Sequence, residues 1–109
     1  MNVPTLKLAD ERSIPQVGLG LWKVKDKAEF EAAFEVALAA GYTHFDSAQA
    51  YENEQFLGAC WQASGRLRES FWLTTKIRTE TIAIGRTAQS FTRSLERLQT
   101  DYVDLLLLH

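Results

Sequence analysis

The segment Tyr102-Val103-Asp104-Leu105-Leu106-Leu107-Leu108 is a nearly continuous apolar run in which only Asp104 is charged. Such a run is typical of a parallel strand that is buried on both faces of its sheet. Three further strands are predicted upstream of it, at residues 17–20, 42–46 and 71–76. Helix-like segments separate the four strands, and this alternation predicts βαβ units with parallel pairing in an α/β fold. The pattern alone does not distinguish a barrel from an open, doubly wound sheet.

The helices are predicted from apolar spacing and from residues that start or stop a helix. Asp26 and Glu29 are spaced as in a capping box, and Gly41 stands where a glycine ends a helix. The first helix is therefore predicted between Asp26 and Gly41. The second is predicted at residues 52–64. The third begins between residues 81 and 87, with an apolar stripe of Ile84, Ala88, Phe91, Leu95 and Leu98. A short β-hairpin, from residues 5–8 and 13–15, is predicted before the first strand.

The composition excludes several classes of protein. Lys and Arg number 12 and Asp and Glu number 14, and this net charge of -2 argues against a nucleic-acid partner. No apolar run approaches the ~20 residues of a membrane helix, and no secretory signal is visible, so no membrane partner is expected. Cys60 is the only cysteine, which excludes an internal disulfide and a cysteine-based zinc cluster and indicates a reducing, cytoplasmic location. The 109 residues are expected to form one domain, too short for a complete (β/α)8 barrel of roughly 250 residues.

Four polar residues mark the carboxyl ends of the predicted strands. Asp46, Lys76 and His109 each close a strand, and Tyr51 lies in the loop that follows Asp46. In parallel α/β folds the ligand lies at this end of the sheet, so the four side chains are expected to face one another. An ammonium beside a phenol stabilises the phenolate, a carboxylate holds the ammonium, and an imidazole donates a hydrogen bond to a carbonyl oxygen. The group lacks a reductant or nucleophile, which points to a cofactor.

Each of these residues also has a structural interpretation that the sequence leaves open. Asp46 and Lys76 are equally well explained as a structural ion pair at a barrel rim, and Tyr51 as an ordinary loop aromatic. His109 is the last residue of the sequence. His44, two residues before Asp46, is interpreted as a core histidine, and Cys60 as a packing residue. Trp22, Trp61 and Trp72 are interpreted as core or rim aromatics.

The known short motifs for dinucleotides, phosphates and metals are absent. Gly18-Leu19-Gly20 starts like a dinucleotide-binding fingerprint, but Lys23 stands where the third glycine belongs. The sequence also contains no GxxxxGK[ST] phosphate loop and no HExxH zinc motif, so no metal site is predicted.

Four segments, in order, resemble the N-terminal part of the aldo-keto reductase family. They are IPQVGLGLW at 14–22, GYTHFDSA at 41–48 followed by YENE at 51–54 and LG at 57–58, LTTK at 73–76, and SLERL at 94–98 followed by DYVDLLLLH at 101–109. The resemblance covers nearly the whole chain. It implies the N-terminal half of a (β/α)8 TIM barrel, truncated, with residues 1–109 as a single partial domain.

The resemblance also implies an activity and a set of site residues. The family places its catalytic tetrad at Asp46, Tyr51, Lys76 and His109, and reduces aldehydes and ketones to alcohols with NADPH, or in some members NADH. Tyr51 would donate the proton, Lys76 would tune Tyr51, Asp46 would pair with Lys76, and His109 would orient the carbonyl. Gly20 and Leu21 would lie with Asp46 at the nicotinamide, and Trp22 would line the substrate pocket with Tyr51 and His109.

Two departures from the family pattern are visible. Thr43 stands where the family often has Arg, and the segments that hold most of the family's cofactor, which follow the tetrad histidine, are absent from these 109 residues. A small carbonyl compound is the expected partner of a parent protein, and the 109-residue chain alone is expected to be inactive. The alternative is a non-catalytic half-barrel remnant that self-associates through its unpaired strand edge.

Overall fold

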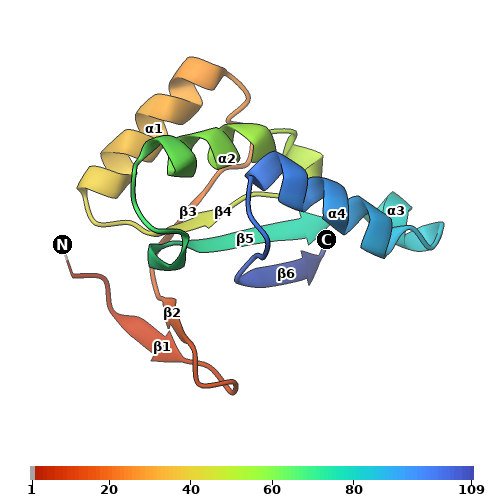
Figure 1. Ribbon diagram of the computed structural model, residues 1–109, viewed down its shortest axis with the longest axis horizontal. Helices are drawn as coiled ribbons and strands as arrows, with labels where there is room; N and C mark the ends of the chain where they lie inside the picture. Colours follow the sequence, from red (N-terminus) through yellow and green to blue (C-terminus); the bar gives the residue numbers. More distant parts are fainter. Residues whose placement is uncertain (1) are drawn as a thin grey trace.

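The computed structural model describes residues 2–109 and consists of one parallel sheet, a separate hairpin and a layer of helices (Figure 1). The sheet has the order β3-β4-β5-β6, with every neighbouring pair parallel. Its strands are β3 (Gly18–Gly20), β4 (His44–Asp46), β5 (Trp72–Ile77) and β6 (Leu105–Leu108). The hairpin consists of β1 (Thr5–Lys7) and β2 (Ser13–Pro15), which pair in antiparallel fashion. The α/β fold with an N-terminal hairpin and parallel β/α units is therefore confirmed.

The helices α1 (Lys27–Ala39), α2 (Glu54–Ala63) and α4 (Thr87–Leu98) lie on one side of the sheet (Figure 1). The short helices η1 (Gln49–Tyr51), η2 (Arg68–Ser70) and α3 (Thr79–Ala83) lie in the connections. The core forms between helices and sheet, where the Phe34 ring stacks on the Phe45 ring at a centroid distance of 4.5 Å. Burial of these large aromatic surfaces is the main stabilising term of this layer.

The predicted boundaries of the first helix are confirmed by its contacts. Asp26 Oδ2 accepts a hydrogen bond of 2.9 Å from the backbone N–H of Glu29, which satisfies a donor that the first turn leaves free. Gly41 follows the helix with φ of 101°, a conformation that a residue with a Cβ adopts at a steric cost. The hairpin and the three first strands also lie within a few residues of their predicted positions.

The third helix, α4, begins at Thr87, within its predicted range, but an additional short helix precedes it. Gly85 has φ of 71° and separates two helices, α3 and α4, where one helix was expected. Ile84, the first residue of the predicted stripe, lies between them and is 68% exposed, so its assignment to the apolar face was wrong. The rest of the stripe is on α4, where Leu98 is fully buried and Phe91 and Leu95 are half-buried. Ala88 is exposed, so its assignment to the apolar face was also wrong.

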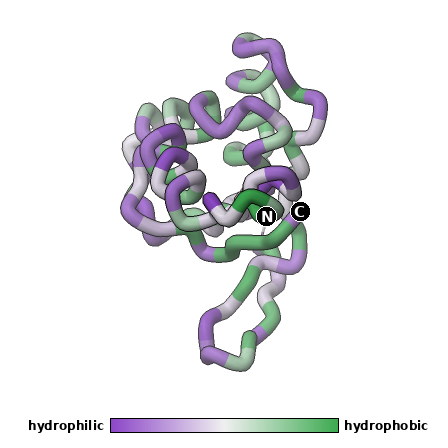
Figure 2. The backbone as a smooth tube through the Cα atoms, turned by 90° about the vertical axis from the view of Figure 1, so that its right-hand side faces the viewer, coloured by the Kyte–Doolittle hydropathy of each residue, from purple (hydrophilic) through white to green (hydrophobic). Residues whose placement is uncertain are grey.

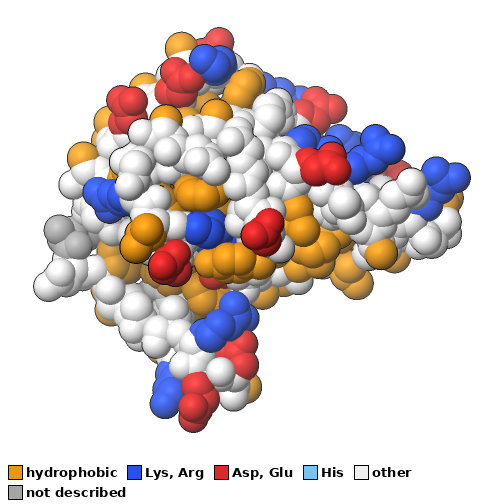
Figure 3. All heavy atoms as spheres, in the orientation of Figure 1, with side chains coloured by type: hydrophobic (Ala, Val, Ile, Leu, Met, Phe, Trp, Pro, Cys, Tyr) orange, Lys and Arg blue, Asp and Glu red, His pale blue; other side chains and the backbone are white. Residues whose placement is uncertain are grey.

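The fourth strand is also more exposed than predicted. It begins at Leu105, and its residues Leu106, Leu107 and Leu108 are exposed, Leu108 to 68%. The prediction of burial on both faces was wrong because β6 is an edge of the sheet and none of the described helices covers its end. Figure 3 shows the resulting band of hydrophobic side chains across the part of the molecule where β5 and β6 lie.

The hairpin projects from the rest of the chain (Figure 2). Its Arg12 donates a hydrogen bond of 2.9 Å to the carbonyl of Asp104 and lies over the Trp72 ring at 5.1 Å. These contacts hold the hairpin at the amino-terminal end of the strands, away from the strand ends that carry the candidate site. In residues 2–109 no helix has both the length and the apolar character needed to cross a membrane.

Candidate active site

The carboxyl ends of β4, β5 and β6 bring the four candidate residues into one place. Asp46 is the last residue of β4, Lys76 is the fifth of the six residues of β5, and His109 directly follows β6. Tyr51 ends the short helix η1, which turns back over the strand ends. Parallel pairing in register produces this arrangement, since each βα connection leaves the sheet at the same edge.

Lys76 is the centre of the cluster. Its Nζ donates hydrogen bonds to Asp46 Oδ1 at 2.6 Å, to the Ser47 carbonyl at 2.9 Å and to Tyr51 Oη at 3.2 Å. An ammonium has three N–H groups, so these three acceptors satisfy it completely and fix its position. The side chain is only 13% exposed, which strengthens its interaction with the Asp46 carboxylate relative to a pair in open water.

Tyr51 and His109 face each other across the cluster. Their rings meet edge to face at a centroid distance of 5.9 Å and an interplanar angle of 83°. The backbone of His109 is held by a hydrogen bond of 3.0 Å from its N–H to the Ile77 carbonyl and by Thr79 Oγ1, which donates to its carbonyl at 3.0 Å. A phenol and an imidazole are thus placed side by side, and both carry groups that hydrogen-bond to a carbonyl oxygen.

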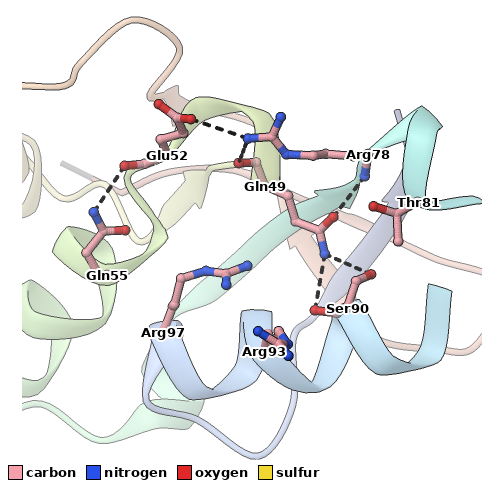
Figure 4. Close-up of a pocket in the computed structure, with 8 residues that line it drawn as sticks. All are labelled: Gln49, Glu52, Gln55, Arg78, Thr81, Ser90, Arg93 and Arg97. Carbon is pink, nitrogen blue, oxygen red and sulfur yellow. Dashed lines mark hydrogen bonds and ion pairs between the residues drawn. The ribbon is translucent and has the colours of Figure 1, made fainter. Parts of the chain in front are cut away.

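Gln49 anchors the short helix that carries Tyr51, a role that was not predicted from the sequence. Its Nε2 donates to Ser94 Oγ at 3.0 Å. The same Nε2 donates to Ser90 Oγ at 3.2 Å, and the Oε1 of Gln49 accepts from the Arg78 N–H at 2.9 Å (Figure 4). One buried amide thereby ties η1 to α4 and to the residue after β5. These side chains border a hollow of about 490 Å³ on the helix side, lined by Gln49, Glu52, Gln55, Arg78, Thr81, Ser90, Arg93 and Arg97 (Figure 4).

An ion pair with a buried carboxylate contacts β5 on the helix side of the sheet. Glu54, the first residue of α2, has a side chain that is 1% exposed. Its carboxylate accepts from Thr75 Oγ1 at 2.7 Å and from Arg97 at 2.9 and 2.8 Å. A buried carboxylate is tolerated when it is paired and hydrogen-bonded in this way. Because Thr75 precedes Lys76, this contact fixes the strand segment that carries the lysine.

The predicted cofactor and pocket residues lie beside the cluster, with different exposures. Leu21 is fully buried in the core, and its N–H donates to the Asp46 carbonyl at 3.0 Å. Gly20 pairs with Asp46 in the sheet, and a Cβ placed there would meet no atom within 4 Å. Trp22 is 66% exposed, with Lys23 Nζ at 4.6 Å from its ring. Among residues 2–109, no hydrogen bond or ring contact joins Trp22 to the four clustered residues.

The inner face of the sheet forms a second hollow, of about 390 Å³, between the strands and the hairpin. His44 lies here with its Nε2 at 3.1 Å from Thr74 Oγ1. Burial lowers the pKa of His44 below 6.5, against the opposing effects of Asp46 and Asp104, and its buried Nδ1 has no hydrogen-bond partner among the described residues. Gly18 leaves room for the ring, since a Cβ there would lie 2.8 Å from His44 Cγ. These contacts are those of a packed histidine.

Trp61, Trp72 and Cys60, which the sequence analysis also named, are packing residues. Trp61 and Trp72 are buried, and Trp61 Nε1 donates to the Leu98 carbonyl at 2.7 Å. Cys60 packs against the core, and burial raises the pKa of its thiol to about 11. The part of the chain that the structure describes contains no group of three His, Cys, Asp or Glu side chains able to hold a metal ion.

Comparison with known proteins identifies the family to which this chain belongs. The sequence profile described as "Aldo/keto reductase family" matches residues 16–109. The chain belongs to the aldo-keto reductase family.

The individual relatives agree with this assignment. An "Aldo-keto reductase" of Mycobacterium sp. (strain KMS) is 42% identical over 109 residues, which are 100% of this chain and 39% of that protein. A "9,11-endoperoxide prostaglandin H2 reductase" of Trypanosoma cruzi is 39% identical over 99% of this chain and 38% of its own length. A "Putative methylglyoxal reductase DkgA" of Salmonella typhi is 38% identical over 108 residues. This chain therefore spans about two fifths of the length of these relatives.

The solved structures extend the likeness to three dimensions. An aldo/keto reductase from Brucella melitensis superposes with a TM-score of 0.91 at 42% identity, over 99% of this chain and 42% of that one. The hairpin and the parallel β/α units thus match the N-terminal part of the family's (β/α)8 barrel, as expected from the sequence.

Proposed function

We propose that this chain carries the catalytic groups of an NAD(P)H-dependent oxidoreductase of the aldo-keto reductase type, which reduces aldehydes and ketones to alcohols. The observation that carries the proposal is the bonding of Lys76, whose ammonium contacts the Asp46 carboxylate and the Tyr51 hydroxyl at the same time. A structural ion pair needs only the first contact. The second places a fixed positive charge beside the Tyr51 hydroxyl, a group that can give a proton to a carbonyl oxygen.

The residues present fit a nicotinamide cofactor at this place. Gly20 offers open, uncrowded backbone directly beside Asp46 in the sheet, which suits the close approach of a flat ring. Asp46 is 35% exposed, and its Oδ2 accepts no hydrogen bond from residues 2–109, so it is free to accept one from a ligand hydroxyl. Gly20 and Asp46 would hold the nicotinamide end, with Leu21 contributing only backbone because its side chain is in the core. Bound NADPH, or alternatively NADH, supplies the hydride for the carbonyl carbon.

The roles of the side chains follow from their contacts. Tyr51 gives its hydroxyl proton to the carbonyl oxygen as the carbon is reduced, and the positive charge of Lys76 stabilises the phenolate that remains. Asp46 holds Lys76 charged and in place. His109, beside the Tyr51 ring, donates a hydrogen bond that orients the carbonyl. Trp22 would form part of the pocket wall for the rest of the substrate.

The proposal is tested in a hybrid in which residues 1–109 are joined to the C-terminal remainder of the Mycobacterium relative. We expect the hybrid to oxidise NADPH in the presence of an aldehyde. Tyr51→Phe should lower turnover by roughly 100-fold or more, because it removes the proton donor. The affinity for NADPH, measured by fluorescence titration, should change little, since the hydroxyl does not hold the nicotinamide.

The matched control is Tyr42→Phe, the same chemical change at a residue that packs against the core away from the cluster. It should leave turnover unchanged. Activity of Tyr51→Phe within tenfold of the parent hybrid would remove Tyr51 from the proposed role. A folded hybrid that binds NADPH but reduces no carbonyl compound would refute the proposed activity itself.

A second function, self-association of a non-catalytic half-barrel, is favoured by the exposed end of β6. Three consecutive leucines on an unpaired strand edge form a surface on which another strand can pair. The occupant would be a second copy of this chain. A small carbonyl substrate and a cytoplasmic location stay predictions that follow from the family.

A further inference from the structure

Asn53 stands at the beginning of α2 but does not do what asparagine usually does there. It is the N-cap residue of α2, yet its side chain makes no capping hydrogen bond. The residue is fully buried. Asparagine is among the preferred N-cap residues because its side chain accepts from the first free N–H groups of the helix. A side chain that gives up this bond in a buried site must be engaged elsewhere.

The amide of Asn53 crosses to the turn that carries Trp22. Its Nδ2 donates to the carbonyl of Leu21 and to the carbonyl of Val24, both at 2.9 Å. These carbonyls flank Trp22 on both sides, and the Val24 N–H closes the turn on the Leu21 carbonyl at 3.2 Å. Lys23 in the same turn has φ of 66°, so the turn is tight and its shape is sterically demanding.

Trp22 itself has little else to hold it. Its side chain is 66% exposed, and its one ring contact among the described residues is with Lys23 of the same turn. The position of the indole is therefore set by the backbone of residues 21–24. That backbone is in turn tied to α2 by the two bonds from Asn53.

The other end of the Asn53 amide reaches the catalytic cluster. Its Oδ1 accepts a hydrogen bond of 2.7 Å from Ser47 Oγ, and the Ser47 carbonyl accepts from Lys76 Nζ at 2.9 Å. One buried side chain thus links the Trp22 turn to the residue that holds Lys76. Both of its N–H groups are used, so the link has a defined geometry.

We propose that Asn53 is a positioning residue that fixes the Trp22 turn relative to Lys76 and Tyr51, and so sets the affinity for bulky apolar carbonyl compounds. Small carbonyl compounds, which do not extend to Trp22, depend on it far less. The part of the proposal that concerns substrates rests on the proposed reductase activity. The part that concerns the placement of Trp22 does not.

The placement of Trp22 is tested in the 109-residue chain labelled with 5-fluorotryptophan. Its three tryptophans give three fluorine resonances, and Trp22→Phe assigns one of them. Asn53→Asp keeps the size of the side chain but removes both bonds to the carbonyls. We expect it to shift and broaden the Trp22 resonance while those of Trp61 and Trp72 stay in place.

The matched control is Gln62→Glu, the same exchange of an amide for a carboxylate on α2, at a side chain whose Nε2 lies 3.5 Å from the Gln99 carbonyl. It should leave all three resonances unchanged. Asn53→Ser, which introduces no charge, is the second variant and should also displace the Trp22 resonance. An unmoved Trp22 resonance in a folded Asn53 variant overturns the proposal. Loss of the Trp61 and Trp72 resonances in both variants also overturns it, because Asn53 would then be a general folding residue.

The effect on substrates is tested in the hybrid used for the proposed function. Asn53→Asp should raise KM for a bulky aromatic aldehyde about tenfold, the size of effect that a misplaced apolar wall produces, and change KM for methylglyoxal little. The pH dependence of kcat should keep its shape, because the bonds of Lys76 are intact. An equal fall of kcat for both substrates with unchanged KM overturns the proposal. A parent hybrid that folds and binds NADPH but is inactive refutes the reductase activity instead, and the fluorine result still decides the placement of Trp22.

Discussion

The helix-covered face and the inner face of the sheet differ in how closely they are packed around their glycines. Where α2 meets α4 on the helix side, the fit leaves no room at Gly58, since a Cβ there would overlap the Arg97 carbonyl of α4. On the inner side the sheet borders a hollow of about 390 Å³, and a Cβ on Gly20 would meet nothing within 4 Å. The contacts on the helix side therefore stabilise the fold, whereas the inner side and the carboxyl ends of the strands carry the candidate catalytic residues.

The difference also concerns polar groups. Glu54 and Gln49, on the helix side, are buried and have their hydrogen bonds satisfied by α4 and β5. Asp46, on the inner side, is partly exposed, with its Oδ2 free of hydrogen bonds from residues 2–109. Satisfied groups hold a structure together, and unsatisfied accessible groups bind ligands.

Alanine substitutions at Gly58 and Gly20 test this difference between the two faces with the largest expected effect. Gly58→Ala should destabilise the chain by about 3 kcal/mol, because the new methyl group overlaps a backbone carbonyl that cannot move without separating α2 from α4. Helix propensity alone predicts the opposite sign, a gain of roughly 1 kcal/mol. Gly20→Ala should change stability by less than about 0.5 kcal/mol. Urea unfolding followed by circular dichroism measures both.

The sign of the Gly58 effect is the decisive result. A Gly58→Ala chain as stable as the parent would mean that α2 and α4 are not in close contact. A large loss for Gly20→Ala would mean that the inner face is packed at that point, against the open space beside Gly20.

Local signals in the sequence were sufficient for most of the fold. Asp26 and Gly41 delimit a helix by the chemistry of their own side chains and backbone, and they were predicted correctly. The alternation of strands and helices gave the parallel order, and strand ends gave the grouping of Asp46, Lys76 and His109. These features depend on neighbours in the sequence or on a general rule for parallel sheets.

The failures involve contacts between distant segments. Gly85 was expected to make only the start of a helix uncertain, but it separates two helices. The burial of the leucines at 105–108 depends on elements outside their own segment. Asn53 and Gln49 show no sequence period that would reveal their role, because each acts through carbonyls and hydroxyls that lie tens of residues away. Asn53 lies in the YENE segment at 51–54 of the family resemblance, which is the signal that could have pointed to it.

The exposed edge of β6 gives the next largest expected effect. Leu106 and Leu108 pair in register with Thr75 and Ile77, so they share the face that helices cover elsewhere in the sheet. Leu106→Lys with Leu108→Lys should shift the chain from self-associated species to monomer in sedimentation velocity, since lysines on an edge strand oppose pairing. Val36→Lys is the control, because this exposed residue lies on α1, which is not next to β6 in the fold. Association that survives the leucine substitutions but not Val36→Lys would place the contact on the outer surface of α1.

The smallest expected effect concerns His44, which lies where the hairpin covers the inner face of the sheet. Burial holds the pKa of His44 below its value of 6.5 in the unfolded chain, although Asp46 and Asp104 favour the charged ring. The unfolded chain therefore binds more protons, so the contribution of neutral His44 is complete above about pH 6.5 and is lost as the pH falls further. We expect stability to fall by less than about 1 kcal/mol from this source between pH 7.5 and 5.5, because the partly exposed ring is screened by solvent. His44→Asn should remove this slope in urea unfolding, and His109→Asn should retain it. Equal slopes in the parent and His44→Asn would mean that water reaches the ring, and that the inner face is open at its lower end as it is beside Gly20.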